Sequence, residues 1–91
     1  MATILTTSKG IEQVTPKDGR KFSLEEAQKI VGGYIQLIHI IDTGEILVCN
    51  EEGKLYDLPY NGLATLYAHM HDALFSDYIV GNVLVCKHNE I

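Results

Sequence analysis

The chain has 91 residues, 46% of them hydrophobic, and its formal net charge at pH 7 is −5. This length and composition predict a single small domain, residues 1–91, with a packed core, and they exclude a disordered chain. Its seven Lys and Arg residues are scattered along the sequence, which argues against binding to the phosphate backbone of nucleic acids.

Two short strands are predicted first. "ATILTT" alternates weakly between apolar and polar residues, and "SKG" forms a turn behind it. The second strand, "IEQVTP", ends before Pro16, which cannot donate a hydrogen bond to a strand ladder. The polar stretch "PKDGRK" then predicts a turn around Asp18 and Gly19.

The stretch "SLEEAQKIVGG" predicts the first helix. Ser23 and Glu26 have the spacing of a capping box, in which each side chain accepts a hydrogen bond from the other residue's backbone N–H. Gly32 is the expected C-cap, because glycine takes the left-handed conformation at little cost. Spacings of three and four residues predict one apolar face, made of Leu24, Ala27, Ile30 and Val31.

The stretch "YIQLIHII", residues 34–41, is the clearest strand pattern in the sequence. Apolar residues on both of its faces predict a central strand that is covered on both sides, at least at its far end. "DTGE" and "ILVCN" predict a hairpin with the next strand, followed by a turn at "EEGK" with Gly53 in the left-handed position. A third, shorter strand is expected at "LYDLP", near the sheet edge because Pro59 ends it.

A second helix is predicted to begin after Asn61, a favourable N-cap residue. Its apolar stripe consists of Leu63, Leu66, Tyr67 and Met70, with the small Ala64 beside it. Residues 71–78 fit either the end of this helix or a loop, and Ser76 resembles a cap. The last stretch, "YIVGNVLVCK", predicts a strand broken at Gly81 and Asn82 by a bulge or a close backbone approach.

The expected order of elements is therefore β-β-α-β-β-β-α-β. Several hairpins and only two helices predict an α+β fold with a small, mostly antiparallel sheet. Cys49 and Cys86 lie in apolar strand-like stretches, and we expect both to be buried thiols in a reducing compartment. A disulfide between neighbouring strands is the alternative. No secretory signal follows Met1 and no apolar run reaches about 18 residues, so we expect a cytoplasmic protein that does not enter a membrane.

Residue patterns typical of catalysis are missing. His69 and His71 point about 200° apart on a helix, so they do not hold one metal ion together with Asp72 and are interpreted as surface histidines. His39 lies in an apolar strand, where a hydrogen-bonded core histidine is the favoured interpretation. No Gly-x-Ser-x-Gly motif and no cysteine at a helix start supplies a nucleophile. We expect neither enzymatic activity nor a cofactor or metal.

Uncharged polar residues stand near the ends of the predicted elements: Gln36, Asn50, Asn61 and Asn82, with Tyr34, Tyr56, Tyr60 and Tyr78. Buried amides must form hydrogen bonds. One interpretation is structural: the amides bond one another or the loop backbone, as caps and bulge supports. The other is a polar pocket with aromatic walls, which would hold a small molecule by reading a base edge or a ribose.

The chain resembles a family of short proteins from bacteriophages and other mobile elements that is catalogued as a domain of unknown function. Four stretches carry the resemblance in this order: "GGYIQLIHI", "NEEGKLYDLP", "NGLAT" and "YIVGNVLV". It covers roughly Ile11 to Val85. The positions that match the family pattern include Gly32, Gly33, Gln36, Asn50, Glu51, Asn61 and Gly81. The resemblance implies a small acidic protein that acts by binding inside bacteria, and it implies no catalytic residues.

Two hypotheses follow. The first is a non-enzymatic counter-defence protein that sequesters a nucleotide-like or other small polar ligand, with a homodimer or higher oligomer enclosing it. Its ligand-binding residues would be Gly32, Gly33, Tyr34, Gln36, Asn50, Glu51, Asn61 and Asn82. The second is an inhibitor or adaptor of a host bacterial protein that acts through a sheet edge or its acidic face. In that case "KLYDLPY" would be the contact strand, with Tyr56 and Tyr60 as aromatic anchors.

Overall fold

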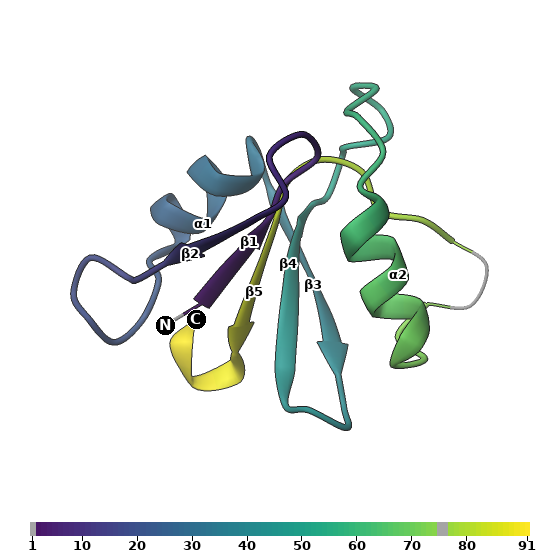
Figure 1. The fold of residues 1–91 in the computed structure, drawn as a ribbon. Helices are drawn as coiled ribbons and strands as arrows, with labels where there is room; N and C mark the ends of the chain where they lie inside the picture. The colour runs from purple at the N-terminus through teal and green to yellow at the C-terminus, as the bar shows by residue number, and fades with distance from the viewer. Residues whose placement is uncertain (1, 75–76) are drawn as a thin grey trace.

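A computed structural model describes residues 2–74 and 77–91 (Figure 1). Within these residues five strands form one antiparallel sheet in the order β2-β1-β5-β4-β3. The strands are β1 (Ala2–Leu5), β2 (Ile11–Val14), β3 (Ile35–Ile40), β4 (Glu45–Asn50) and β5 (Val83–Lys87). The helices are α1 (Leu24–Val31), α2 (Gly62–Met70) and a short 3₁₀ helix, η1 (His88–Glu90). The predicted α+β class with an antiparallel sheet is confirmed.

The strand predicted at "LYDLP" is absent from the described structure. Residues 51–57 form turns, and Asp57 has a left-handed φ of 53°, which is incompatible with an extended strand. A single bridge joins Tyr60 to Val80 farther along. Gly53 also differs from expectation, since it is not among the residues with positive φ. A glycine is required at this position because there is no space for a side chain: a Cβ there would lie 2.7 Å from Cγ2 of Val80.

The position of β3 is the main correction to the predicted sheet. It was expected at the centre, yet it pairs only with β4 and forms one edge. The centre is β5, which pairs with both β1 and β4. Strands β4 and β5 are apolar on both faces as well, so this pattern did not distinguish the three strands. The pairing of β1 with the distant β5 decides the order.

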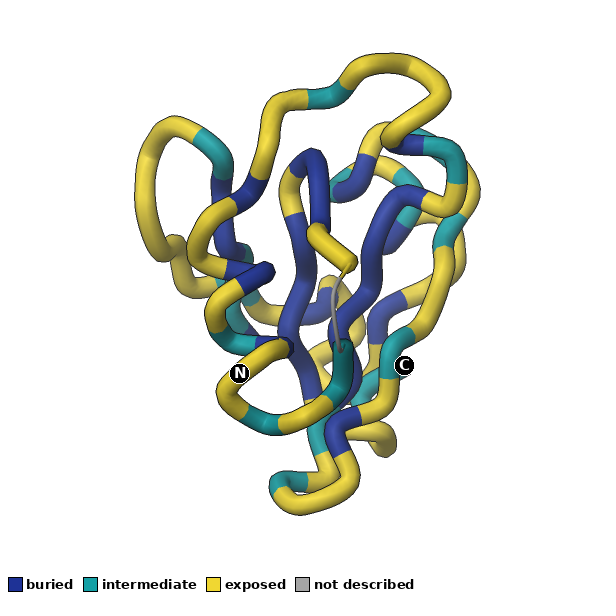
Figure 2. The backbone as a smooth tube through the Cα atoms, turned by 90° about the vertical axis from the view of Figure 1, so that its right-hand side faces the viewer, coloured by how far each residue is buried: buried dark blue, intermediate teal, exposed yellow. Residues whose placement is uncertain are grey.

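Two separate cores cover the two faces of the sheet. Because side chains alternate along a strand, Ile46 and Val48 of β4 pack on the α1 side, whereas Leu47 and Cys49 pack on the α2 side. Strand β5 divides its side chains in the same way. Figure 1 shows the two helices on either side of the sheet, and Figure 2 shows buried backbone along the central strands and mostly exposed loops around them.

Helix α1 has the predicted caps. The Ser23 side chain accepts a hydrogen bond from the Glu26 N–H at 3.1 Å, and the Glu26 carboxylate accepts one from the Ser23 N–H at 2.9 Å. Gly32 ends the helix in the left-handed conformation, with φ of 83°. The buried face is narrower than predicted, because Ala27 and Val31 are buried while Leu24 is exposed.

Helix α2 has the predicted N-cap, but most of its predicted apolar stripe is exposed. Tyr67 of that stripe is half-buried and packs against the core. Small residues face the sheet, namely Ala64, Thr65 and Ala68. Leu66 and Met70 are 60% and 69% exposed, and Leu63 is also exposed. The rotation is set by Asn61, whose Nδ2 donates to the carbonyl oxygens of Leu5 and Gly81, both at 2.8 Å. The small side chains of Ala64 and Ala68 share the core on this side of the sheet with Leu47 and Val83.

Residues 71–74 form a turn beyond α2, which places them outside the helix, while the predicted cap Ser76 lies outside the described residues. The final strand begins at Val83, and Gly81 precedes it with φ of 79°. None of the described helices is long and apolar enough to cross a membrane.

The predicted burial of both cysteines is confirmed, and both are free thiols. Cys49 lies in the core on the α2 side and Cys86 in the core on the α1 side, so the sheet separates them. Burial raises the pKa of Cys49 to about 12 and, with smaller contributions from two carboxylates, that of Cys86 to about 11. Neither thiol is therefore a ready nucleophile.

Candidate binding cleft beside strand β3

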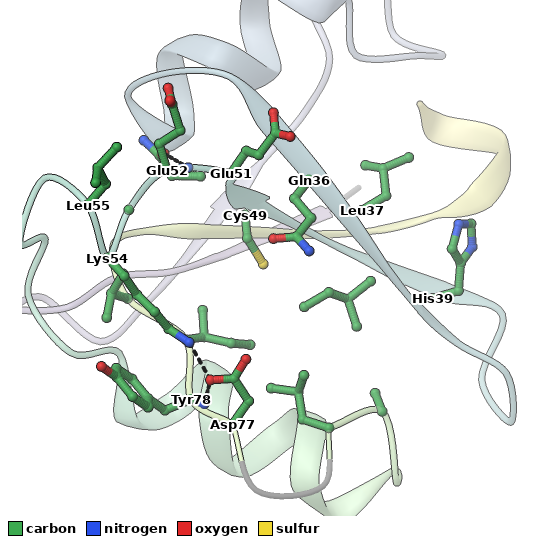
Figure 3. Close-up of a pocket in the computed structure, with 17 residues that line it drawn as sticks. Gln36, Leu37, His39, Cys49, Glu51, Glu52, Lys54, Leu55, Asp77 and Tyr78 are labelled. Atoms are coloured by element: carbon green, nitrogen blue, oxygen red, sulfur yellow. Dashed lines mark hydrogen bonds and ion pairs between the residues drawn. The ribbon is translucent and has the colours of Figure 1, made fainter.

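A cleft of about 490 Å³ lies beside β3, on the α2 side of the sheet (Figure 3). Strand β3 forms one wall. The turns after β4 form a second wall, and residues 73–74 and 77–80 form a third. Its apolar lining includes Ile38, Cys49, Leu74, Ile79 and Val80. Its polar lining includes Gln36, Glu51, Glu52, Lys54, Asp77 and Tyr78. The cleft thus combines an apolar surface with a charged rim.

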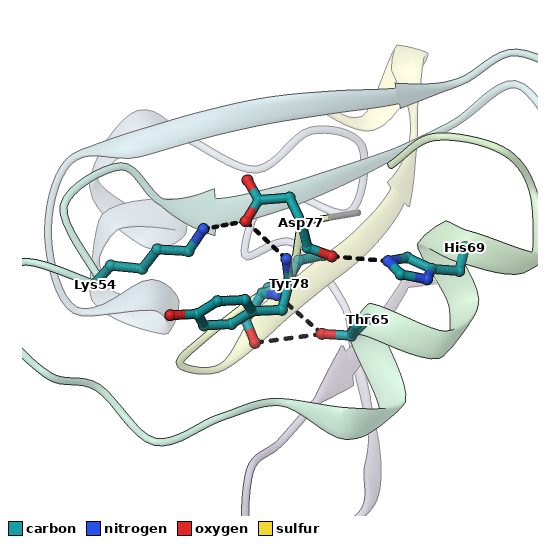
Figure 4. Close-up of polar contacts among 6 residues, drawn as sticks. Lys54, Thr65, His69, Asp77 and Tyr78 are labelled. Carbon is teal, nitrogen blue, oxygen red and sulfur yellow. Dashed lines mark hydrogen bonds and ion pairs between the residues drawn. The ribbon is translucent and has the colours of Figure 1, made fainter. Parts of the chain in front are cut away.

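Lys54 and Asp77 close one side of the cleft with an ion pair (Figure 4). The Lys54 ammonium also lies 4.3 Å from the centre of the Tyr78 ring, a cation–π contact. The hydrogen bond from Lys54, with that of the Tyr78 N–H, holds the pKa of Asp77 below its usual range. The ion pair favours the ionised form of Asp77, and Lys54 already has a carboxylate partner.

Helix α2 holds this side of the cleft in place. The Thr65 hydroxyl accepts a hydrogen bond from the Ile79 N–H at 2.9 Å. A ring nitrogen of His69 lies 2.7 Å from the carbonyl oxygen of Asp77 (Figure 4). The wall opposite β3 is thus tied to a helix rather than left as a free loop.

The charge of the lining is acidic. The lining includes three carboxylates, those of Glu51, Glu52 and Asp77, and one amino group, that of Lys54. Figure 3 shows Glu51 and Glu52 next to each other at the end where β3 begins, away from the Lys54–Asp77 pair. Neither forms an ion pair with any residue that the structure describes. This end of the cleft therefore has a negative potential.

The outer edge of β3 presents unpaired backbone groups. The Glu51 N–H donates to the Tyr34 carbonyl at 2.8 Å, and this sets the alternation of the antiparallel β3–β4 ladder. The backbone groups of Gln36 and Ile38 consequently face β4, whereas those of Leu37 and His39 face outward. No other described residue forms a backbone hydrogen bond with Leu37 or His39.

The two edges of the sheet differ in their protection. Edge strands are usually protected by charged residues, proline or short length. Strand β2 has only four residues, includes Glu12 and is followed closely by Pro16. Strand β3 has six residues, "IQLIHI", with no acidic or basic residue other than His39. His39 is exposed on this edge, so its prediction as a core residue was wrong.

The side chain of Asn50, a predicted ligand-binding residue, forms hydrogen bonds with backbone groups. Its Nδ2 donates to the Val31 carbonyl at 3.1 Å, and its Oδ1 accepts from the Glu52 N–H at 2.8 Å. It thus joins the end of α1 to the turn after β4. This also explains Gly33, because a Cβ at that position would lie 2.9 Å from Nδ2 of Asn50.

Asn61 is fully buried, and its side chain also forms hydrogen bonds with backbone groups. Besides its two carbonyl contacts, its Oδ1 accepts the Ala64 N–H at 3.0 Å. Asn82 is exposed, and its Oδ1 accepts the Thr7 N–H at 3.1 Å. The structural interpretation therefore accounts for the contacts of Asn50, Asn61 and Asn82.

The predicted site residues separate into three groups. Gln36, Asn50 and Glu51 line the cleft beside β3. A shallower hollow of about 750 Å³ next to α1 is lined by Gly32, Gly33, Tyr34, Asn50 and Tyr56, among others. Asn61, Asn82 and Tyr60 line neither hollow, although the Tyr60 ring lies 6.1 Å from that of Tyr78. Gln36 and Asn61 do not share a site.

The described residues contain no group of three or more His, Cys, Asp or Glu side chains that could hold a metal ion. His71 instead pairs with the Asp42 carboxylate at 3.0 Å, and His69 contacts the Asp77 carbonyl.

Comparison with known proteins places the chain in a family. The family described as "Domain of unknown function (DUF3846)" matches residues 2–91. The chain belongs to this family. No curated protein and no solved structure matches the chain. A domain family of unknown function is what the resemblance of the four sequence stretches implied, and the match covers nearly the whole chain.

Sequence reasoning missed the Lys54–Asp77 pair and the outward position of Leu37 in this family member. The two charged residues are 23 positions apart, and no local pattern connects them. Leu37 belonged to a strand that was expected at the centre. One available signal was the lack of Lys, Arg, Asp, Glu and Pro in "YIQLIHII", which is compatible with an open edge as well as with a buried strand.

Proposed function

We propose that this protein is a non-enzymatic binding protein that holds an extended segment of a partner protein along β3. The observation that carries the proposal is the unprotected edge of β3 directly beside the cleft. A segment that adds to such an edge gains backbone hydrogen bonds, and its alternate side chains enter neighbouring pockets. The outward groups of Leu37 and His39 would supply the hydrogen bonds, and the cleft would receive the side chains.

The chemistry of the lining supports binding rather than catalysis. Cys49 is the thiol that lines the cleft, and its raised pKa of about 12 keeps it protonated. The carboxylate of Asp77 is engaged by Lys54. His39 lines the cleft without a described partner that would orient it as a general base.

A small polar ligand is the second candidate. The cleft volume of about 490 Å³ is within the range of small-molecule sites, and the exposed Gln36 amide lines it. The nucleotide-like ligand expected from the sequence is less well supported, because the carboxylates of Glu51 and Glu52 would repel phosphate groups. A partner protein segment, the second hypothesis of the sequence analysis, fits the edge and the charge better. Its contact strand would be β3 in place of "KLYDLPY".

The biological setting is part of the proposal and rests on the family resemblance. We propose a phage or mobile-element protein that acts in the bacterial cytoplasm by blocking or recruiting a host protein, as counter-defence proteins do. The homodimer expected from the small size of the chain stays a prediction. Sedimentation analysis of the purified protein, which reports the mass in solution, decides it.

Leu37→Pro tests the edge directly. Proline removes an N–H that the β3–β4 ladder does not use, and its ring blocks the approach of an added strand. We expect short linear peptides selected from a random displayed library on the wild-type protein to lose at least about tenfold in affinity for the variant. Fluorescence anisotropy with labelled synthetic copies of the selected peptides measures this loss.

A matched control is available on the opposite edge. Gln13 of β2 is exposed, and its backbone N–H also faces outward, because the pairing Thr3↔Gln13 alternates with the hydrogen-bonded pairs. Gln13→Pro should leave peptide affinity unchanged. The proposal is wrong if the selected peptides bind the Leu37→Pro variant as tightly as the wild type while circular dichroism shows both proteins folded.

A further inference from the structure

We infer that the segment held along β3 is basic, with Lys or Arg at the end beside Glu51 and apolar side chains over the cleft. The inference rests on the proposed function and specifies its ligand. The open edge by itself does not favour particular side chains, because backbone hydrogen bonds are the same for every sequence. The inference therefore adds the kind of side chains that the bound segment carries.

The charge distribution selects the basic end. Glu51 is exposed and follows β4 directly, opposite Tyr34 at the start of β3. Glu52 is adjacent and also lines the cleft. The amino group of the lining, that of Lys54, is already paired with Asp77. A cationic side chain of the bound segment would therefore meet two carboxylates that lack a counter-ion among the described residues.

The apolar lining selects the middle of the segment. Side chains of an added strand alternate between the two faces of the sheet. Those on the α2 side would lie over the cleft, next to Ile38 and Leu74, both of which are half-buried. Those on the α1 side would lie next to Leu37, which is 40% exposed. Apolar or β-branched residues fit both positions, since they would cover apolar surface that water now contacts.

The net charge of the whole molecule acts in the same direction. At −5 it attracts basic segments and repels acidic ones, which raises the association rate of the former at low ionic strength. This attraction is screened by salt, whereas the contact with Glu51 and Glu52 is local. A test of the local contact therefore needs a control variant that changes the net charge by the same amount at positions away from Glu51 and Glu52.

The test compares peptides selected from the same library on three proteins. These are the wild type, the double variant Glu51→Gln/Glu52→Gln, and the control Glu12→Gln/Asp18→Asn. The two control positions are exposed and line neither the cleft nor the hollow next to α1, and the control has the same net charge as the first variant. We expect Lys and Arg to be enriched in peptides from the wild type and the control, but not in those from the Glu51/Glu52 variant. We expect a basic peptide from the wild type to bind that variant about tenfold more weakly.

The outcomes distinguish the inference from the function beneath it. Peptides that need an intact Leu37 edge but show no Lys or Arg enrichment overturn the basic segment and leave the edge proposal standing. Equal enrichment on all three proteins also overturns it, because the net charge then accounts for the preference. If no selected peptide is sensitive to Leu37→Pro, the proposed function fails and the inference fails with it.

Discussion

At the scale of single residues, the asparagines of this protein illustrate how amide side chains can replace regular structure. Asn61 caps α2 and at the same time bonds two carbonyl oxygens from β1 and from the chain before β5. Asn50 similarly joins the end of α1 to the turn after β4. Each forms hydrogen bonds with backbone groups of segments far apart in the chain. Their position near element ends therefore reflects structural demand.

Asn61→Ala should lower the free energy of unfolding by about 3 kcal/mol, because it removes a cap and two further hydrogen bonds to carbonyl oxygens at a fully buried position. Asn61→Ser, which keeps the cap acceptor but not the amide donors, should lose less. Urea unfolding followed by circular dichroism measures both. Loss of ligand binding without loss of stability would contradict the structural role of Asn61.

At the scale of elements, α2 shows that an apolar stripe does not by itself define the buried face. Its nine residues, "GLATLYAHM", include no Lys, Arg, Asp or Glu, so several rotations bury mainly uncharged groups. The Asn61 contacts select the rotation in which Ala64 and Ala68 meet the sheet. Leu63, Leu66 and Met70 then face solvent.

A pair of substitutions tests this rotation of α2. Leu66→Gln should change the free energy of unfolding by less than about 0.5 kcal/mol, because Leu66 is largely exposed. Ala68→Leu should destabilise the protein by about 2 kcal/mol, because there is no space for a larger side chain at a fully buried position. Chemical unfolding of the two variants checks both. The reverse order of effects would mean that the leucine stripe faces the sheet.

At the scale of the whole molecule, the sheet separates two cores, one under each helix. Each core contains one cysteine, and both thiols come from the two central strands β4 and β5. Exposure of these strands requires opening of the sheet rather than movement of a loop. The thiols therefore report on the opening of the whole domain.

We expect Cys49 and Cys86 to react with iodoacetamide very slowly near pH 8 in the folded protein. Their raised pKa values, about 12 and about 11, leave little thiolate at that pH, and both side chains are buried. Mass spectrometry after alkylation, with and without urea, measures the difference. Cys49 lines the cleft, so faster alkylation of Cys49 alone would indicate that the cleft opens locally.

Local sequence patterns determined the parts of this fold that depend on neighbouring residues. The capping box of Ser23 and Glu26, the glycine C-cap of α1, the N-cap Asn61 and the β3–β4 hairpin all follow from residues a few positions apart. The α+β class follows from the same patterns. Each is an interaction of short range, which the sequence alone specifies.

Tertiary structure alone decided the order of the strands, the rotation of α2 and the composition of the cleft. The pairing of β1 with β5 moves β3 to the edge, and this exposes Leu37 and His39. Likewise, the cleft joins Gln36 to Asp77, two residues far apart in the chain. Such contacts depend on which distant segments pair and pack. Hydrophobic periodicity does not distinguish among uncharged strands and faces that are equally suited to burial.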